Sequence, residues 1–455
     1  WWLEAVVLLV QVLAILAVAY FAAVASSDRD AETWLWRSGP LPEEWQLPTE
    51  GAAVIAVALL AMTVAPVYPA IGLYVYLGLL YLYDGCRVEY GFVRQSGILE
   101  CVTALTALGC VGWMIRRRRR PVWLASRLTW LATALVGWLG VGTMVSTFTG
   151  SAAHPAIEYR FLQFVAAWVL FLVAAQTLRK PREFWWLGVV LGAVLSVHGL
   201  RAHDLPELGQ NIAAASVMAL PMVVLAARLS PNKIMQLALA LVAVNLLWLL
   251  AQTRNRGAAV GLMVALLLSW LQSDRKWLRL ALVAPLLLVG CPWFASTGYG
   301  KRFVNLVRGG PNWDRATAEK RLELWQAGMR IAWDHPVLGV GLENYGAVAG
   351  QYGPKLAGKN PHTNFVTMAC EAGFPGLVLY AALFFGAIGA AWRQGRVSTG
   401  LWPGGAARSV AAALGAYLTA GFFLGLHSHG AAYVLAGGVV GLGSTLSGRE
   451  LADST

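Results

Sequence analysis

Residues 360–376 read Asn-Pro-His-Thr-Asn-Phe-Val-Thr-Met-Ala-Cys-Glu-Ala-Gly-Phe-Pro-Gly, and they join the longest polar segment of the chain to a hydrophobic run. His362 and Glu371 within this stretch are titratable. Such side chains are costly at the edge of a hydrocarbon layer unless they have a partner or a task. The stretch therefore predicts a membrane-embedded fold, and its two titratable residues are candidates for chemistry.

Hydrophobic runs dominate the rest of the chain. The 455 residues are 58% hydrophobic and only 13% charged, which excludes an ordinary soluble protein. The runs have the length that a helix needs to cross a hydrocarbon core of about 30 Å, so we predict an all-α, polytopic membrane protein with about 12–14 transmembrane helices. The predicted spans are residues 3–25, 51–66, 68–83, 97–115, 127–148, 159–178, 184–200, 211–228, 234–250, 257–272, 278–295, 364–392, 406–426 and 430–447.

The polar segment divides the chain into three parts. Residues 1–295 hold about eleven predicted spans, residues 296–361 form one larger loop region, and residues 362–455 hold about three spans. Within the loop region, apolar side chains recur at helical spacing from Trp313 to Trp333, which predicts an amphipathic helix lying in the membrane interface. The predicted apolar stripe of this helix is Leu322, Trp325, Met329 and Ala332 or Trp333.

Clusters of arginine and lysine follow alternate spans. Short positively charged loops remain cytoplasmic, so these clusters predict that both termini are cytoplasmic and that residues 296–361 lie outside. The formal net charge of +12 is then a consequence of topology, not a sign of nucleic-acid binding. The clusters are residues 116–120, 179–182, 228–233, 275–276 and 393–396.

Under this topology all seven histidines lie at or near the outer face. Histidine titrates nearest neutral pH, so proton-transfer chemistry is expected on that side. His362 is the main candidate, as a general base or as a group that orients an attacking hydroxyl. The alternative is a cap at the start of the next helix. His427 and His429 lack a neighbouring carboxylate, and the five cysteines show no paired spacing, so we predict neither a metal site nor a disulfide framework.

Several arginines fall where spans meet the outer face. Guanidinium groups bind phosphate oxygens in pairs, so a group of them can hold a diphosphate. The alternative for each arginine is an ordinary contact with lipid phosphates. Arg256 stands out because Gly257 and two alanines follow it and would allow another element to pack closely. The candidates are Arg256, Arg321, Arg201 and Arg254 for a diphosphate, and Arg160, Asn211, Asn364 and Glu371 for other parts of a substrate.

Three motifs of the chain resemble those of the O-antigen ligase and polymerase superfamily, whose members are bacterial polytopic membrane glycosyltransferases. The first is the Arg256-Gly257 pair that opens a span, and the second is an outer loop with Arg321, Trp325 and residues 335–344. The third is His362-Thr363-Asn364, followed by glycines at the start of the next span. The resemblance covers residues 200–392, and the first half of the chain matches only by its hydropathy.

The resemblance implies transfer of a glycan from undecaprenyl diphosphate to an acceptor hydroxyl, on lipid A core, a glycan or a protein. It implies a periplasmic site in the bacterial inner membrane, with no metal and no cofactor. His362 corresponds to the catalytic position of the family, and Arg256 and Arg321 correspond to the arginines that hold the diphosphate. Arg201 corresponds less closely.

Two other functions remain open at this stage. A polymerase of the same superfamily would use a second lipid-linked glycan as its acceptor, although the short loops before residue 296 favour a ligase. A transporter or flippase of lipid-linked or anionic substrates would belong to a different class. Such proteins place charges and broken helices at the middle of the bilayer and often contain inverted repeats, whereas this chain keeps its charges at the outer edge and shows no repeat.

Overall fold

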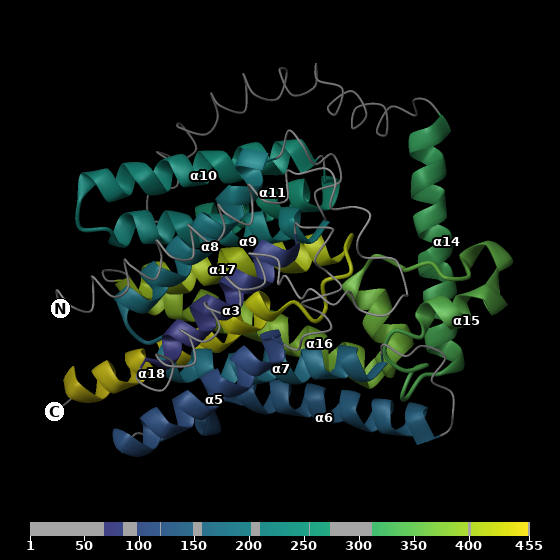
Figure 1. Ribbon diagram of the computed structural model, residues 1–455, viewed down its shortest axis with the longest axis horizontal. Coiled ribbons are helices and arrows are strands. Elements are labelled where there is room, and N and C mark those ends of the chain that lie inside the picture. The colour runs from purple at the N-terminus through teal and green to yellow at the C-terminus, as the bar shows by residue number, and fades with distance from the viewer. Residues whose placement is uncertain are drawn as a thin grey trace, which may run out of the picture.

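The computed structural model describes residues 68–84, 98–118, 120–148, 157–201, 210–253, 255–273, 312–398 and 402–453. Within these ranges the chain is all-α, without a strand, as predicted (Figure 1). With the labels of Figure 1, the α-helices are α3 (Pro69–Asp84), α5 (Ile98–Arg116), α6 (Arg127–Phe148), α7 (Ile157–Thr177), α8 (Pro181–Arg201), α9 (Gln210–Leu229), α10 (Lys233–Thr253), α11 (Arg256–Leu271), α14 (Asn312–Asp334), α15 (Tyr345–Tyr352), α16 (Asn364–Val397), α17 (Trp402–Gly421) and α18 (Gly430–Asp453).

Six of these helices are long and apolar enough to cross a membrane, and three shorter ones are also apolar. The polytopic membrane fold is therefore confirmed. Eleven predicted spans coincide with a described helix, and the other three, at 3–25, 51–66 and 278–295, lie outside the described residues. The helix found for the span predicted at 406–426 runs from Trp402 to Gly421, and it ends earlier than predicted because the backbone then turns through residues 422–429.

Helix α17 lies at the centre of the bundle and packs against α9, α11 and α16. Most of its residues are buried and it is rich in alanine and glycine, which is typical of a helix enclosed by others. A Cβ atom at Gly261 of α11 would lie 2.8 Å from the carbonyl oxygen of Ala416, so the two backbones approach closely. Small residues at such crossings are how membrane helices maximise contact. This packing brings the start of α11 next to the α17–α18 connection.

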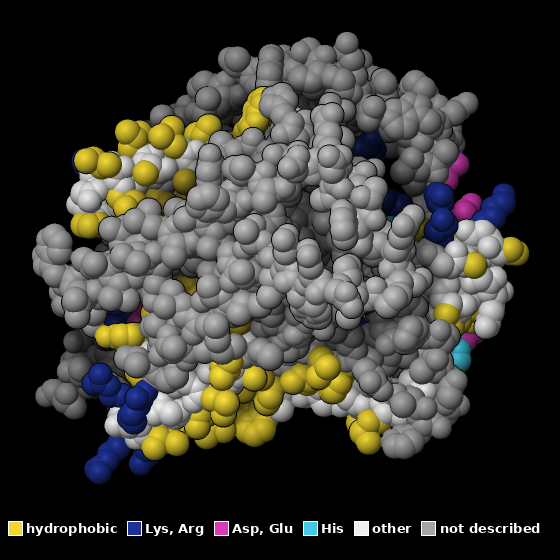
Figure 2. Space-filling model, viewed as in Figure 1, with side chains coloured by type: hydrophobic (Ala, Val, Ile, Leu, Met, Phe, Trp, Pro, Cys, Tyr) yellow, Lys and Arg dark blue, Asp and Glu magenta, His cyan; other side chains and the backbone are white. Residues whose placement is uncertain are grey.

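Large apolar side chains remain exposed on the outer helices. Figure 2 shows them gathered over α10 and over α5 and α6, between the two ends of the bundle. A soluble protein seldom exposes so much apolar surface, whereas a helix bundle in lipid must do so. The exposed residues include Leu108, Ile115, Met144, Ile234, Leu237, Leu241 and Val244.

Helix α14 confirms the helix predicted from Trp313 to Trp333, and it runs across the ends of the spanning helices (Figure 1). Its buried face was predicted only in part. Leu322 is 52% exposed and Trp333 is 69% exposed, whereas Leu324 and Ile331 are buried against α15 and α16. Periodicity alone does not show which apolar side of a helix packs on the bundle and which remains outside.

Candidate active site

Helix α16 is broken near its start, at Gly373 (φ 71°, ψ 177°). The loop that follows α14 fills the break. The N–H of Val340 donates to the carbonyl of Cys370 (2.9 Å), and the N–H of Gly341 donates to the carbonyl of Glu371 (3.0 Å). These bonds satisfy carbonyl groups that the interrupted helix no longer pairs, as a membrane-embedded backbone requires.

Two further bonds complete this junction. The N–H of Phe374 donates to the carbonyl of Pro336 (2.9 Å), and the indole N–H of Trp138, from α6, donates to the carbonyl of Ala372 (2.9 Å). The loop from Pro336 to Glu343, here called the 336–343 loop, is therefore built into the bundle. It fixes the first two turns of α16 relative to α14.

Two glycines make this insertion possible. A Cβ atom at Gly373 would lie 2.0 Å from the carbonyl oxygen of Val337, and one at Gly339 would lie 2.4 Å from the carbonyl carbon of Glu371. Both glycines also have positive φ, which side chains seldom adopt. The glycines of the 336–343 loop thus allow a tight turn against α16.

His362 lies in the turn that leads into α16. Its backbone N–H donates to the side-chain oxygen of Asn360 (2.8 Å). The indole N–H of Trp325, on α14, donates to the carbonyl of Pro361 (2.9 Å). His362 itself has φ 51°, a left-handed conformation that costs roughly 1–3 kcal/mol and persists where the surroundings impose it. Helix α16 begins two residues later, at Asn364, close to the predicted start.

His362, Arg321 and Arg256 come together from three different elements. Burial and the nearby Arg321 guanidinium lower the pKa of His362, so its ring is neutral near pH 7. Burial and the nearby Arg256 lower the pKa of Arg321. Among the described residues, neither the His362 ring nor the Arg321 guanidinium has a hydrogen-bond or ion-pair partner. Two cations held this close favour an anionic ligand between or beside them.

The sequence around Arg256 explains its position. The side chain of Asn255 accepts a hydrogen bond from the N–H of Ala258 (3.0 Å), so Asn255 caps α11 and Arg256 is its first residue. A Cβ atom at Gly257 would lie 2.6 Å from the Cβ of Phe423, in the α17–α18 connection. The close packing that Gly257 was predicted to allow is therefore present.

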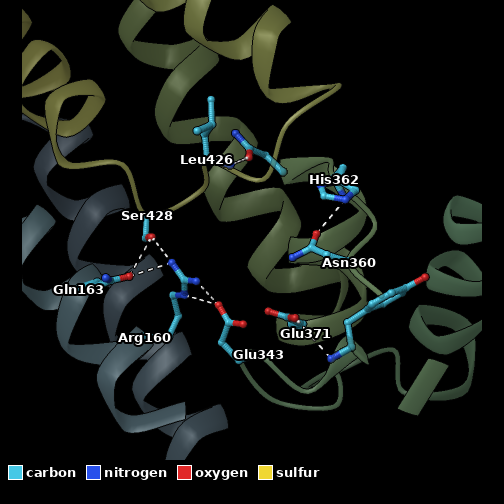
Figure 3. Close-up of polar contacts among 10 residues, drawn as sticks. Arg160, Gln163, Glu343, Asn360, His362, Glu371, Leu426 and Ser428 are labelled. Atoms are coloured by element: carbon cyan, nitrogen blue, oxygen red, sulfur yellow. Dashed lines mark hydrogen bonds and ion pairs between the residues drawn. The ribbon is translucent and has the colours of Figure 1, made fainter. Parts of the chain in front are cut away.

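Arg160 joins three separate segments (Figure 3). Its guanidinium forms an ion pair with Glu343, at the end of the 336–343 loop. It also donates to Ser428 in the α17–α18 connection (3.0 Å) and to Gln163 on its own helix (2.8 Å). Arg160 is thus already bound to protein groups, and its predicted contact with substrate stays a prediction.

Asn364 is fully buried and also bonds protein groups on both sides. Its amide N–H donates to the hydroxyl of Tyr380 (2.9 Å), and its carbonyl accepts from the N–H of Leu426. The hydroxyl of Tyr417 donates to the carbonyl of Leu426 (2.6 Å). Asn364 therefore ties the start of α16 to the α17–α18 connection, and it would act on His362, two residues away, by holding the turn in place.

Glu371 is buried beneath the 336–343 loop. One of its carboxylate oxygens accepts from the N–H of Tyr345 (3.4 Å), and the other has no partner among the described residues. Glu343, which sequence reasoning missed, lies close to Glu371 and pairs with Arg160. Its place in a turn-rich stretch, far in sequence from Arg160, carried no signal of that pairing.

Three other predicted residues are only partly placed. Arg201 is the last residue of α8 and Asn211 is the second residue of α9, so their backbones lie at the end of the bundle where α11 begins. Their side chains, and Arg254 altogether, lie outside the described residues. Their role in substrate binding remains a prediction.

His427 is buried and stacks on the ring of Phe164, with 5.7 Å between the ring centroids. Burial and the nearby Arg160 lower the pKa of His427 to about 3, so the ring is uncharged. Among the described residues no group of three or more histidine, cysteine or acidic side chains is arranged to hold a metal ion.

These features define a class: an all-α membrane protein with a neutral histidine and two arginines gathered at one end of the bundle. Residues 237–381 match the family described as O-antigen ligase. The resemblance to the O-antigen ligase superfamily that the motifs predicted is therefore confirmed over this range. The matched range contains Arg256, Arg321 and His362. No curated protein matches the chain.

Proposed function

We propose that this protein is a glycosyltransferase that moves a glycan from undecaprenyl diphosphate to an acceptor hydroxyl, on lipid A core or a protein. The site would face the periplasm from the bacterial inner membrane, with both chain termini in the cytoplasm. The family match supports a ligase-like or polymerase-like activity, and the donor, acceptor and mechanism are the finer parts of the proposal.

The observation that carries the proposal is the position of His362 beside Arg321 and Arg256. A general base must be unprotonated, and the lowered pKa of His362 keeps it so at neutral pH. A departing diphosphate needs positive charge at the point where its own negative charge develops, and two guanidinium groups supply it. The proposal is supported by the nearness of His362 to Arg321 and of Arg321 to Arg256, which come from the turn before α16, α14 and α11.

The chemistry then follows from these roles. His362 accepts the proton of the acceptor hydroxyl while the oxygen attacks the anomeric carbon of the donor glycan. The bond from that carbon to the diphosphate breaks, and Arg256 and Arg321 stabilise the released undecaprenyl diphosphate. The proton leaves His362 to water before the next turnover. Attack on the side opposite the diphosphate gives inversion at the anomeric carbon.

The test uses the purified full chain in detergent with an undecaprenyl-diphosphate-linked glycan and a lipid A-core acceptor. Wild type is compared with His362→Ala and with His335→Ala, whose histidine is exposed at the same end of the protein. We expect joined product from wild type and from His335→Ala, with or without EDTA, and none from His362→Ala. Full activity of His362→Ala would contradict the assigned base.

The product also distinguishes the alternatives. Longer lipid-linked chains without transfer to lipid A core would show that the protein is a polymerase. If wild type forms neither product, with protein acceptors included, the glycosyltransferase proposal fails. Movement of the intact lipid-linked glycan across reconstituted vesicles would then favour a flippase.

A further inference from the structure

The connection between α5 and α6 carries a concentration of positive charge at the end of the bundle away from His362. Four of its arginines are exposed, and the sequence from residue 116 to residue 130 contains no aspartate or glutamate. Figure 2 shows a group of basic side chains projecting beyond the apolar surface of α5 and α6. The four exposed arginines are Arg116, Arg117, Arg118 and Arg120.

This connection is held in place by the bundle. Gln176 of α7 is 1% exposed, and its side chain bonds the connection twice. Its amide oxygen accepts from the N–H of Val122 (3.0 Å), and its amide N–H donates to the carbonyl of Arg120 (3.3 Å). A short 3-10 helix, Val122–Ala125, follows and packs against α7 and α18. The backbone of Arg120 is therefore held against α7.

An apolar surface leads directly to these arginines. Leu108, Val111 and Ile115 of α5 are exposed, and their spacing places them on one face of the helix, which ends at Arg116. Trp130, at the start of α6, is also exposed, and its indole N–H donates to the carbonyl of Leu124 (3.2 Å). Exposed tryptophan is typical of the boundary between hydrocarbon and headgroups. The exposed arginines therefore lie next to this boundary, between the end of α5 and the start of α6.

We propose that the α5–α6 connection is a binding site for an anionic phospholipid. The headgroup phosphate would bind the guanidinium groups of Arg117, Arg118 and Arg120, and the acyl chains would lie along the exposed face of α5. A free phosphate would use the arginines but not the apolar face. A zwitterionic lipid would bring its own cation into a group that already carries an excess of positive charge. This inference is independent of the proposed glycosyl transfer.

The experiment measures lipid retention by native mass spectrometry of the full chain, titrated in detergent with dioleoylphosphatidylglycerol or dioleoylphosphatidylcholine. The test variant replaces Arg117, Arg118 and Arg120 with glutamine. A matched control replaces three exposed basic residues near α14 and α15, namely Arg330, Lys355 and Lys359, with glutamine. We expect wild type and the control to retain phosphatidylglycerol, and the test variant to lose at least about tenfold in apparent affinity.

Loss of these charges could also disturb membrane insertion, because arginines direct topology. A second variant with lysine at the same three positions keeps the charge but loses the paired hydrogen bonds of the guanidinium fork, so its affinity should be intermediate. Wild-type affinity in the lysine and glutamine variants would overturn the proposal. Equal retention of phosphatidylcholine, or displacement of the lipid by millimolar inorganic phosphate, would overturn it too.

Discussion

Two regions at the same end of the bundle place a histidine near an arginine. In the turn before α16, His362 lies near Arg321, and in the α17–α18 connection, His427 lies near Arg160. In both regions, burial and the neighbouring guanidinium lower the pKa of the histidine. The local chemistry is therefore similar, and composition alone does not separate the two.

The two regions differ in whether the arginine is paired with a carboxylate and in how far the histidine ring is buried. Arg160 is paired with Glu343, and its histidine, His427, is buried against an aromatic ring. Arg321 has no such carboxylate among the described residues, and His362 is only half-buried. A neutralised arginine completes a scaffold, whereas an arginine without a carboxylate leaves positive charge for a ligand. On this contrast we propose a structural role for His427 and Arg160 and a chemical role for His362 and Arg321.

Replacing each of the two histidines in turn gives the largest expected difference. We expect His362→Ala to lower the transfer rate by about 10²- to 10⁴-fold, which is the usual contribution of a general base. His427→Phe should leave the rate close to wild type, because the ring remains to stack on Phe164 and neither of its nitrogens has a partner. Initial rates at saturating donor decide it. A large loss in His427→Phe alone would reverse the assignment.

Arg321 and Arg160 should differ in how substitution changes the transfer activity, and this is the second largest expected effect. Arg321→Ala should lower kcat/KM by about 10²-fold or more, and Arg321→Lys should recover little of it, because lysine cannot form the paired contact. Exchange of Arg160 and Glu343 in the double variant Arg160→Glu/Glu343→Arg should recover more activity than either single change, because it restores the ion pair. Steady-state kinetics of these five variants, the two single changes at Arg160 and Glu343 included, provides the check. Failure of the exchange to recover activity would suggest that Arg160 contacts substrate directly.

Stability should distinguish the glycines in α16. Gly373→Ala would push a Cβ atom into the carbonyl of Val337, in a conformation that alanine seldom adopts, so we expect a loss of about 2–4 kcal/mol. Gly389→Ala, where nothing lies within 4 Å of the added atom, should be neutral or slightly stabilising. Thermal unfolding in detergent measures both. Equal midpoints would show that the 336–343 loop does not constrain the helix.

The smallest expected effect is on the pH dependence of the transfer rate. In the proposed mechanism the neutral form of His362 is the active one, so we expect the rate to fall as the pH drops through its pKa. Because that pKa is lowered, activity should persist below the ordinary histidine value of about 6.5. Arg321→Gln removes a neighbouring positive charge, which should raise the pKa and move the acidic limb of kcat/KM to higher pH. An unchanged limb in this variant would mean that another group controls it.

The spans were readable from the sequence because hydrophobic length is a local property. Helix α6 begins and ends where it was predicted, at residues 127 and 148. The break at Gly373 was not predicted, because it depends on a loop that lies more than thirty residues earlier in the chain. The motif that contains His362 could be recognised in the sequence. Its approach to Arg321 depends on Trp325 and on the packing of α14, and hydropathy contains neither.

The same reasoning explains the ambiguity of Arg160. From the sequence it was one more arginine at the start of a span, and its pairing with Glu343 crosses from α7 to a distant loop. Local spacing records which side of a helix a residue occupies. It does not record which partner neutralises that residue.

The bond between Asn364 and Leu426 has a consequence for how the protein is made. The turn that holds His362 is synthesised first, but the backbone group that anchors it emerges from the ribosome about sixty residues later. Early helices can enter the membrane while the site is still unformed. A nascent chain that stops before residue 422 would contain α17 but not Leu426, so we expect the turn that holds His362 to become fixed only once the α17–α18 connection has been made.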